Sequence, residues 1–271
     1  MILRPQSNSP RHGTGFVPVW EAIRRAQQAN SATYQLVRQP HHALLSGQLV
    51  ERFTIPQMPQ VTEEIVRGIS LHDEGWAAFD SGSERLRATS ARYSGANVAL
   101  NAAGKPLCFL DIKAGDFLRA WQESIEAAEA VAPIAGLMVS GHFFRLGKFG
   151  VSAGAYNEED TRRINEFLEG EESRRQRLLL HETRSREEVE YWTDVLQFCD
   201  LLSLFLCCGS EESVEFPQQI TADKRTVNLH VSDGVYALSP SPFAEEVEFS
   251  LGGYAFDGAE NHLIRLTWRV R

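Results

Sequence analysis

The feature that most constrains this chain is a long apolar run, residues 195–209 (VLQFCDLLSLFLCCG), whose only ionisable carboxylate is Asp200. If the run is helical, most of its surface must be buried. A buried carboxylate without a partner costs several kcal/mol, so it is protonated, paired or bound to a metal. No lysine or arginine lies within one helical turn of Asp200. We expect its partner to be a metal ion or a histidine of another helix; a purely structural pair with a distant histidine or arginine is the alternative.

A His-Asp dipeptide lies on the apolar face of a second predicted helix, residues 61–80. Its inward series is Ile65, Ile69, His72 and Trp76, and Asp73 lies at the edge of that face. An imidazole and a carboxylate that face one neighbour suit a hard or borderline divalent metal. The alternative is a core histidine beside an aspartate that bonds the backbone.

Two further histidines fall on apolar faces of predicted helices. His42 shares its face with Leu45 and Leu49, whereas its neighbour His41 is expected to face solvent or to support the site from behind. His142 lies in the almost uncharged stretch 133–146, one turn after Met138. Either histidine alone is more often a core residue than a ligand. Four ionisable positions on four helices make a stronger case for one site.

The pattern of apolar residues divides the chain into three regions. Residues 1–35 are expected to be peripheral, with one short helix, and residues 36–209 to form a helical body. Residues 210–271 alternate with period two and predict an antiparallel sheet packed on that body. The predicted fold class is therefore mainly α with a C-terminal β appendage, α+β overall. The glycine-rich stretch 81–113 is expected to be a long loop with one strand at residues 107–112.

Charge and composition exclude several functional classes. The 271-residue chain has a formal net charge of −9 and a pI near 5.4. Such a balance disfavours nucleic acid and anionic membranes as partners. The chain has four cysteines without a C-x-x-C spacing, and its N-terminus has no apolar stretch typical of a signal peptide. No window reaches the length of uncharged apolar sequence that a membrane-spanning helix needs. We expect a cytoplasmic protein.

The order of these ionisable residues resembles a known signature. His42, then His72-Asp73, then Asp200 resembles the H…HD…D pattern of the HD-domain superfamily of metal-dependent phosphohydrolases. The segments QPHHALLSGQLVERF, ISLHDEGW and SGHFF are also similar to an uncharacterised bacterial family within that superfamily. The resemblance covers about residues 36–208. It implies an HD-like helical bundle in which these four residues bind a divalent cation, with His142 as a candidate ligand for a second one.

The resemblance also implies a reaction. A transition metal (Fe, Mn, Ni, Zn or Co, one or two ions) would activate water to hydrolyse a small phosphate ester or nucleotide. Asp73 would bridge metal and water or act as a base, and Glu74 is a candidate proton shuttle. Arg145 and Lys148 are candidates to hold the phosphate; the alternative is that these two cations stabilise a helix C-terminus.

Two other functions remain open at this point. Some HD-type bundles hold two irons and activate oxygen, which would require a ligand beyond the four. A non-catalytic module that binds a metal or a small ligand is the other alternative. The expected partner is a small phosphorylated molecule, and a homo-oligomer is possible.

Overall fold

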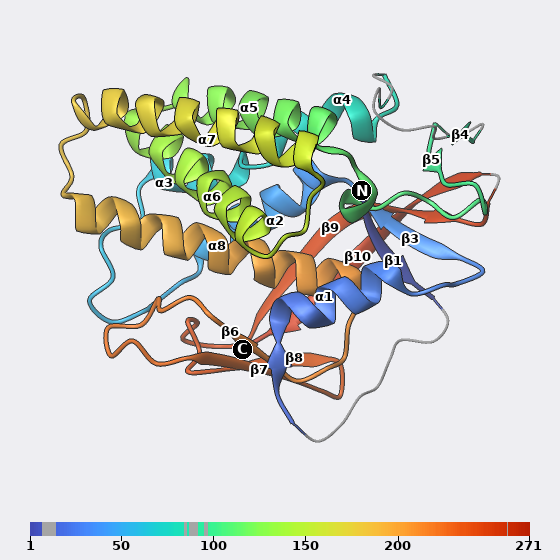
Figure 1. Ribbon diagram of the computed structural model, residues 1–271. Coiled ribbons are helices and arrows are strands. Elements are labelled where there is room, and N and C mark those ends of the chain that lie inside the picture. Colours follow the sequence, from blue (N-terminus) through green and yellow to red (C-terminus); the bar gives the residue numbers. More distant parts are fainter. Residues whose placement is uncertain (7–14, 84–85, 87–91, 95–96, 259) are drawn as a thin grey trace.

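Helices dominate the middle of the chain, and strands occur at both of its ends (Figure 1). The computed structural model describes residues 1–271 except 7–14, 84–85, 87–91, 95–96 and 259. In chain order the elements are β1 (Ile2–Pro5), β2 (Val17–Pro18), α1 (Val19–Gln28), β3 (Tyr34–Val37), α2 (Gln39–Glu51), α3 (Glu63–Ser70), the 3₁₀ helix η1 (Glu74–Trp76), α4 (Ala77–Asp80), β4 (Arg92–Tyr93), β5 (Ala99–Leu100), the 3₁₀ helix η2 (Phe109–Asp111), α5 (Ala114–Glu129), α6 (Pro133–Ser152), α7 (Glu158–Leu179), α8 (Arg186–Cys208), β6 (Val214–Phe216), β7 (Val227–Ser232), β8 (Val235–Ser239), β9 (Val247–Phe256) and β10 (Asn261–Val270).

The main sheet combines strands from both ends of the chain. Its eight strands run in the order β1-β3-β9-β10-β8-β7-β6-β2. The β9–β10 hairpin is its longest pairing, in register from Val247 opposite Val270 to Phe256 opposite Asn261. The N-terminal strands β1 and β3 extend this hairpin on one side through the antiparallel β3–β9 pairing. Two neighbouring pairs, β10–β8 and β2–β6, are parallel, so the sheet is mixed.

This sheet corrects the predicted fold class. A helical bundle with a C-terminal antiparallel appendage is wrong, because the sheet is mixed and three of its strands come from the first 37 residues. The N-terminal segment is not wholly peripheral either, since Ile2 and Leu3 are fully buried. Short strands such as β1 carry too few residues to show a period, and period-two alternation does not reveal the partner of a strand.

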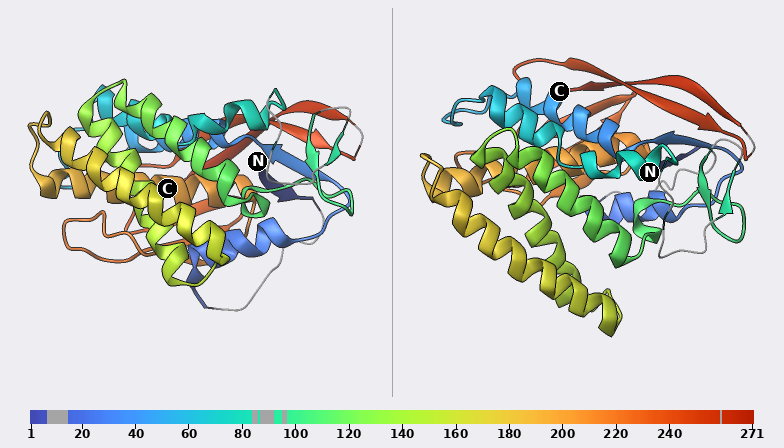
Figure 2. Two further views of the ribbon diagram at one scale, coloured as in Figure 1. Left: turned by 45° about the horizontal axis from the view of Figure 1, so that its top comes forward. Right: turned by 90° about the horizontal axis from the view of Figure 1, so that it is seen from above.

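Helix α8 forms the centre of the molecule. Figures 1 and 2 show it between the helices α5–α7 on one side and the strands on the other. The indole nitrogen of Trp268, on β10, donates to the Leu206 carbonyl near the C-terminal end of α8 at 3.0 Å. One continuous hydrophobic core contains Trp192 and Phe205 of α8 together with side chains of the sheet. Asp200 therefore lies in the C-terminal half of a largely buried helix.

In the described part of the chain, α8 is the one helix long and apolar enough to cross a membrane by length and composition alone. Of its most apolar 18-residue window, 78% is buried inside the protein. Its apolar surface is thus covered by the neighbouring helices and strands, as in a core helix.

The local structure tests further predictions. Helices α5, α6, α7 and α8 all lie within residues 36–209, the region expected to be helical. The strand predicted at residues 107–112 is wrong, because this segment contains the 3₁₀ helix η2. The continuous helix predicted at 61–80 is also wrong: α3 ends at Ser70, and a turn separates it from η1.

Candidate metal centre

Helix α2 places His42 inside the protein. Pro40 stands in the first turn of the helix, where its missing N–H costs no hydrogen bond and its fixed φ favours helix. His42, Leu45 and Leu49 follow at helical spacing, and all three are fully buried. The preceding residue of the helix, His41, points away from this buried face, and its Nδ1 lies 3.1 Å from the carbonyl oxygen of Gly252 on β9. The prediction that His42 faces inward is confirmed.

The break after α3 is what turns His72 and Asp73 toward the same space. In an uninterrupted helix, the Ile69 carbonyl would accept the backbone N–H of residue 73. Here that carbonyl accepts the backbone N–H of His72 at 3.4 Å and lies 2.7 Å from the ring Nδ1 of His72. Consecutive side chains in a helix point about 100° apart, and the turn removes this separation. The His-Asp dipeptide thus lies in a turn and not in the middle of a helix.

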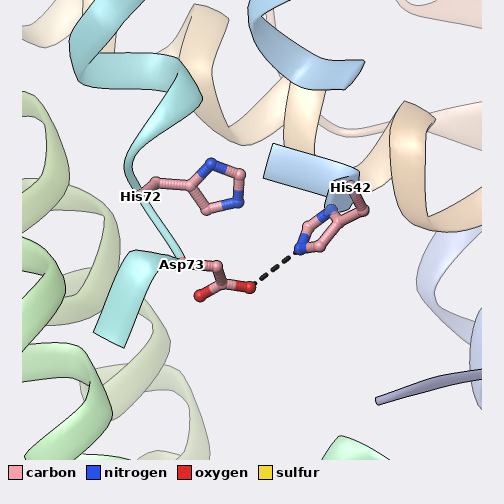
Figure 3. Close-up of side chains that lie close together, drawn as sticks. All are labelled: His42, His72 and Asp73. Carbon is pink, nitrogen blue, oxygen red and sulfur yellow. Dashed lines mark hydrogen bonds and ion pairs between the residues drawn. The ribbon is translucent and has the colours of Figure 1, made fainter. Parts of the chain in front are cut away.

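His42, His72 and Asp73 form a group that could hold a metal ion (Figure 3). Each offers one ligand atom, and these atoms lie within 4.8 Å of one another. His42 Nε2 lies 2.8 Å from Asp73 Oδ2. The two imidazole rings meet edge to face, with centroids 5.0 Å apart. Both rings have no exposed surface, so the group is enclosed by protein on the side of the histidines.

Asp200 and His142 complete the group from the other side. Asp200 Oδ1 lies 3.3 Å from His72 Nε2, and Asp200 Oδ2 lies 3.9 Å from His142 Nε2. The other ring nitrogen of His142, Nδ1, is buried and has no hydrogen-bond partner among the described residues. The prediction that a histidine of another helix accompanies Asp200 is confirmed. All five predicted ligand residues therefore meet at one place.

The ionisable groups of this cluster have strongly shifted pKa values. Burial alone would lower the pKa of His72, but its hydrogen bond to Asp200 and the charges of Asp73 and Asp200 raise that pKa to about 9. Burial alone would raise the pKa of Asp200, but the hydrogen bond from His72 and the neighbouring histidines lower it to about 2. The pKa of Asp73 is also lowered, because its hydrogen bond to His42 and the charge of His72 outweigh burial. Burial lowers the pKa of His142 to about 4.

The donor set fits a divalent cation. A carbonyl only accepts, so the Nδ1 of His72 must carry a proton, and its Nε2 is directed at the Asp200 carboxylate. A backbone carbonyl behind a ring in this way is the usual support of a metal-binding histidine. Two atoms that bind one ion at about 2.1 Å each lie about 3.0–3.4 Å apart. The 2.8 Å and 3.3 Å contacts between ring nitrogens and carboxylates are close to that span. In the metal-free protein, a proton on His72 supplies the positive charge between the carboxylates.

These shifts predict that the contribution of His72 and His142 to the stability of the metal-free protein is largest near pH 6.5. The raised pKa of His72 stabilises the fold fully below pH 6.5, and this contribution, about 3 kcal/mol at most, is lost as pH rises to 9. The lowered pKa of His142 destabilises the fold as the pH falls from 6.5 to 4. In this range the unfolded chain binds a proton on His142 that the folded protein does not bind. Urea unfolding in the presence of a chelator, from pH 4 to 9.5, measures both slopes. A His72→Gln variant should lack the loss above pH 6.5, and an unchanged slope in that variant would contradict the assignment.

The other predicted site residues lie outside this group. Glu74 follows Asp73 directly, at the start of η1, and is exposed. Lys148 is exposed on α6, with its Nζ 5.1 Å from the centre of the Phe144 ring. The guanidinium of Arg145 donates hydrogen bonds to three side chains of α8, at 2.6–2.7 Å: Asp194, Gln197 and Glu190. The structure thus brings the predicted metal ligands together and joins Arg145 to α8.

Sequence reasoning missed two groups that support the cluster. The first is the Ile69 carbonyl, which no side-chain pattern reveals. The second is Ser203, whose Oγ lies 2.9 Å from Nδ1 of His42. A signal for Ser203 was present, since it is a polar residue in the apolar run 195–209, one helical turn after Asp200.

The comparisons with known proteins identify the family of the chain. No curated protein and no solved structure matches it. A family model described as a protein of unknown function (DUF3891) matches residues 25–255, which include all five residues of the cluster. The match covers most of the 271 residues, and the chain belongs to this DUF3891 family.

Proposed function

We propose that this protein is a metal-dependent hydrolase that acts on a small phosphate ester or nucleotide. The observation that carries the proposal is the buried meeting of three histidines and two carboxylates from distant parts of the chain. Imidazole and carboxylate together suit Fe, Mn, Ni, Zn or Co. The order of these residues, which resembles the signature of HD-domain phosphohydrolases, supports a phosphate ester as the substrate.

The bound ion would lower the pKa of a coordinated water and polarise a phosphoryl oxygen. His42 and His72, with no exposed surface, close the inner side of the cluster. Asp73 and Asp200 keep 6% and 7% of their surface exposed, so in this proposal water and substrate would approach the cluster at the carboxylates. In this proposal Asp73 would orient the attacking water, and Glu74, exposed beside it, would take up the proton that the water releases. The water oxygen would bond to phosphorus as the ester P–O bond breaks, and a proton returned through Glu74 or solvent would let the leaving group depart as an alcohol.

This proposal is tested by phosphate release from p-nitrophenyl phosphate, bis(p-nitrophenyl) phosphate and nucleoside monophosphates. The protein is stripped with a chelator and reloaded with one metal at a time. We expect turnover only after reloading, and a loss of about 10²–10⁴-fold in Asp73→Asn. A matched control is Glu169→Gln on α7, which is exposed and outside the cluster. Reloaded protein that binds metal but releases no phosphate from any substrate would contradict the hydrolase and favour a binding module.

One observation favours a second candidate, an oxygen-activating centre with two irons. The two oxygens of Asp200 face different imidazoles, Oδ1 toward His72 and Oδ2 toward His142. A carboxylate in this position is able to bridge two ions. Metal content decides between the candidates: two irons per chain together with oxygen consumption would favour oxidation, and phosphate release would favour hydrolysis.

A further inference from the structure

Ser203 lies behind the candidate metal centre, at a junction of hydrogen bonds. It is fully buried on α8. Its Oγ donates to the carbonyl oxygen of Asp200 at 2.9 Å, and it lies 2.9 Å from His42 Nδ1. The Oγ of Ser46, on α2, is also 2.9 Å away. One hydroxyl thus connects the helix that carries Asp200 with the helix that carries His42.

The direction of each hydrogen bond at this junction follows from the number of protons when an ion occupies Nε2 of His42. A serine hydroxyl has one proton to donate and two lone pairs that accept. The Ser203 proton is within reach of the Asp200 carbonyl, which only accepts. A neutral His42 ring with its Nε2 on the ion carries its one proton on Nδ1, and the Ser203 Oγ accepts it. The Ser46 hydroxyl is able to donate into the remaining lone pair of Ser203.

We propose that Ser203 is a positioning residue that fixes the tautomer of His42, so that Nε2 is the nitrogen offered to the metal. This inference rests on the metal centre of the proposed function. His72 shows the same arrangement independently, since the Ile69 carbonyl accepts from its Nδ1 and its Nε2 faces Asp200. Both buried rings therefore direct Nε2 at a carboxylate. In each ring the group that contacts Nδ1, Ser203 for His42 and the Ile69 carbonyl for His72, favours this orientation.

Without Ser203, His42 loses both its tautomer preference and its orientation. In Ser203→Ala the Nδ1 proton has no acceptor, and the alternative tautomer places a proton on Nε2, where the ion binds. Loss of such a supporting hydrogen bond typically weakens metal binding about 10–100-fold. Ser46 touches Ser203 but not the His42 ring among the contacts of the described residues, and its hydroxyl also reaches the carbonyls of His42 and Cys199. Ser46→Ala is therefore the matched control.

The first measurement is zinc affinity, by competition with a chelating dye, in wild type and in Ser203→Ala, Ser203→Thr and Ser46→Ala. We expect a loss of about 10–100-fold in Ser203→Ala, recovery in Ser203→Thr, which keeps the hydroxyl, and near wild-type affinity in Ser46→Ala. Equal affinity of wild type and Ser203→Ala would overturn the role of Ser203 and leave the metal centre intact. Absence of zinc binding by wild type would instead overturn the metal centre, and this inference with it.

The second measurement reads the tautomer directly, and its decisive result comes from the wild-type protein. In zinc-loaded wild type with ¹⁵N-labelled histidine, the proton of His42 should appear on Nδ1, at the low field of a hydrogen-bonded imidazole N–H. In Ser203→Ala this signal should move upfield, which a change in packing alone would not cause. A His42 ring with a bare Nδ1 in the wild type would overturn the proposal.

Discussion

Replacing both His72 and Asp73 by alanine is expected to reduce bound metal from about one or two ions per chain to nearly none. The variant removes two of the three atoms that lie within 4.8 Å of one another. His42, His142 and Asp200 remain, but only His42 belongs to that group. We expect these three not to retain an ion, since metal affinity depends on the number of ligands and on their fixed geometry. Plasma mass spectrometry on protein reloaded with Fe, Mn, Ni, Zn or Co measures the content directly.

The chain offers a matched pair of single variants for the same experiment. His41 and His42 are neighbours on α2, but His42 is fully buried in the cluster and His41 is directed to the Gly252 carbonyl. We expect His42→Ala to lose most of its metal and His41→Ala to keep the wild-type content. Equal metal in both variants, or wild-type metal in the His72→Ala, Asp73→Ala double variant, would show that the ion is held elsewhere or not at all.

Gly75→Ala is expected to destabilise the protein and to impair metal binding without removing any ligand. A Cβ at Gly75 would lie 2.0 Å from the carbonyl oxygen of Ala120 and 2.9 Å from its carbon. Backbone cannot yield as a flexible side chain does, so η1 must move away from α5. Overpacking of this kind costs about 1–3 kcal/mol. Because Asp73 lies two residues before Gly75, the shift also moves a ligand atom.

Urea unfolding and metal content, measured on the same preparation, test this expectation. The control is Gly170→Ala on α7, where an added Cβ meets nothing within 4 Å and alanine favours helix by up to about 1 kcal/mol. Gly170→Ala should be as stable as wild type or more stable, with unchanged metal. A Gly75→Ala protein of wild-type stability and metal content would show that α5 does not fix the position of the His-Asp turn.

The residues of the cluster could be predicted from the sequence because each breaks a local rule. Asp200 is a carboxylate that must be buried, and the cost of burying it demands a partner. His42, His72 and His142 occupy positions that otherwise carry apolar side chains. Such violations are visible in one sequence, since helical periodicity alone shows which face is buried.

The sheet and the details of the site could not be predicted in this way, because they depend on distant contacts. The pairing of β3 with β9 joins residues more than two hundred positions apart, and period-two alternation does not encode it. At the end of α3 the ring of His72 lies at the Ile69 carbonyl, a contact that helix propensity does not describe. Arg145 is predicted as a phosphate ligand from its guanidinium group and its position one turn beyond His142, whereas its three acceptors on α8 become visible only when the helices are packed.

The separation of the cluster along the chain imposes an order on synthesis. His72 and Asp200 are 128 residues apart, and His42 and Ser203 are 161 apart. During translation, His42, His72 and Asp73 leave the ribosome well before Asp200, so the five-residue cluster is incomplete until α8 has been made. The complete cluster therefore forms only when α8 has docked between the helices and the sheet, and an ion held by all five residues would mark a chain whose core is already assembled.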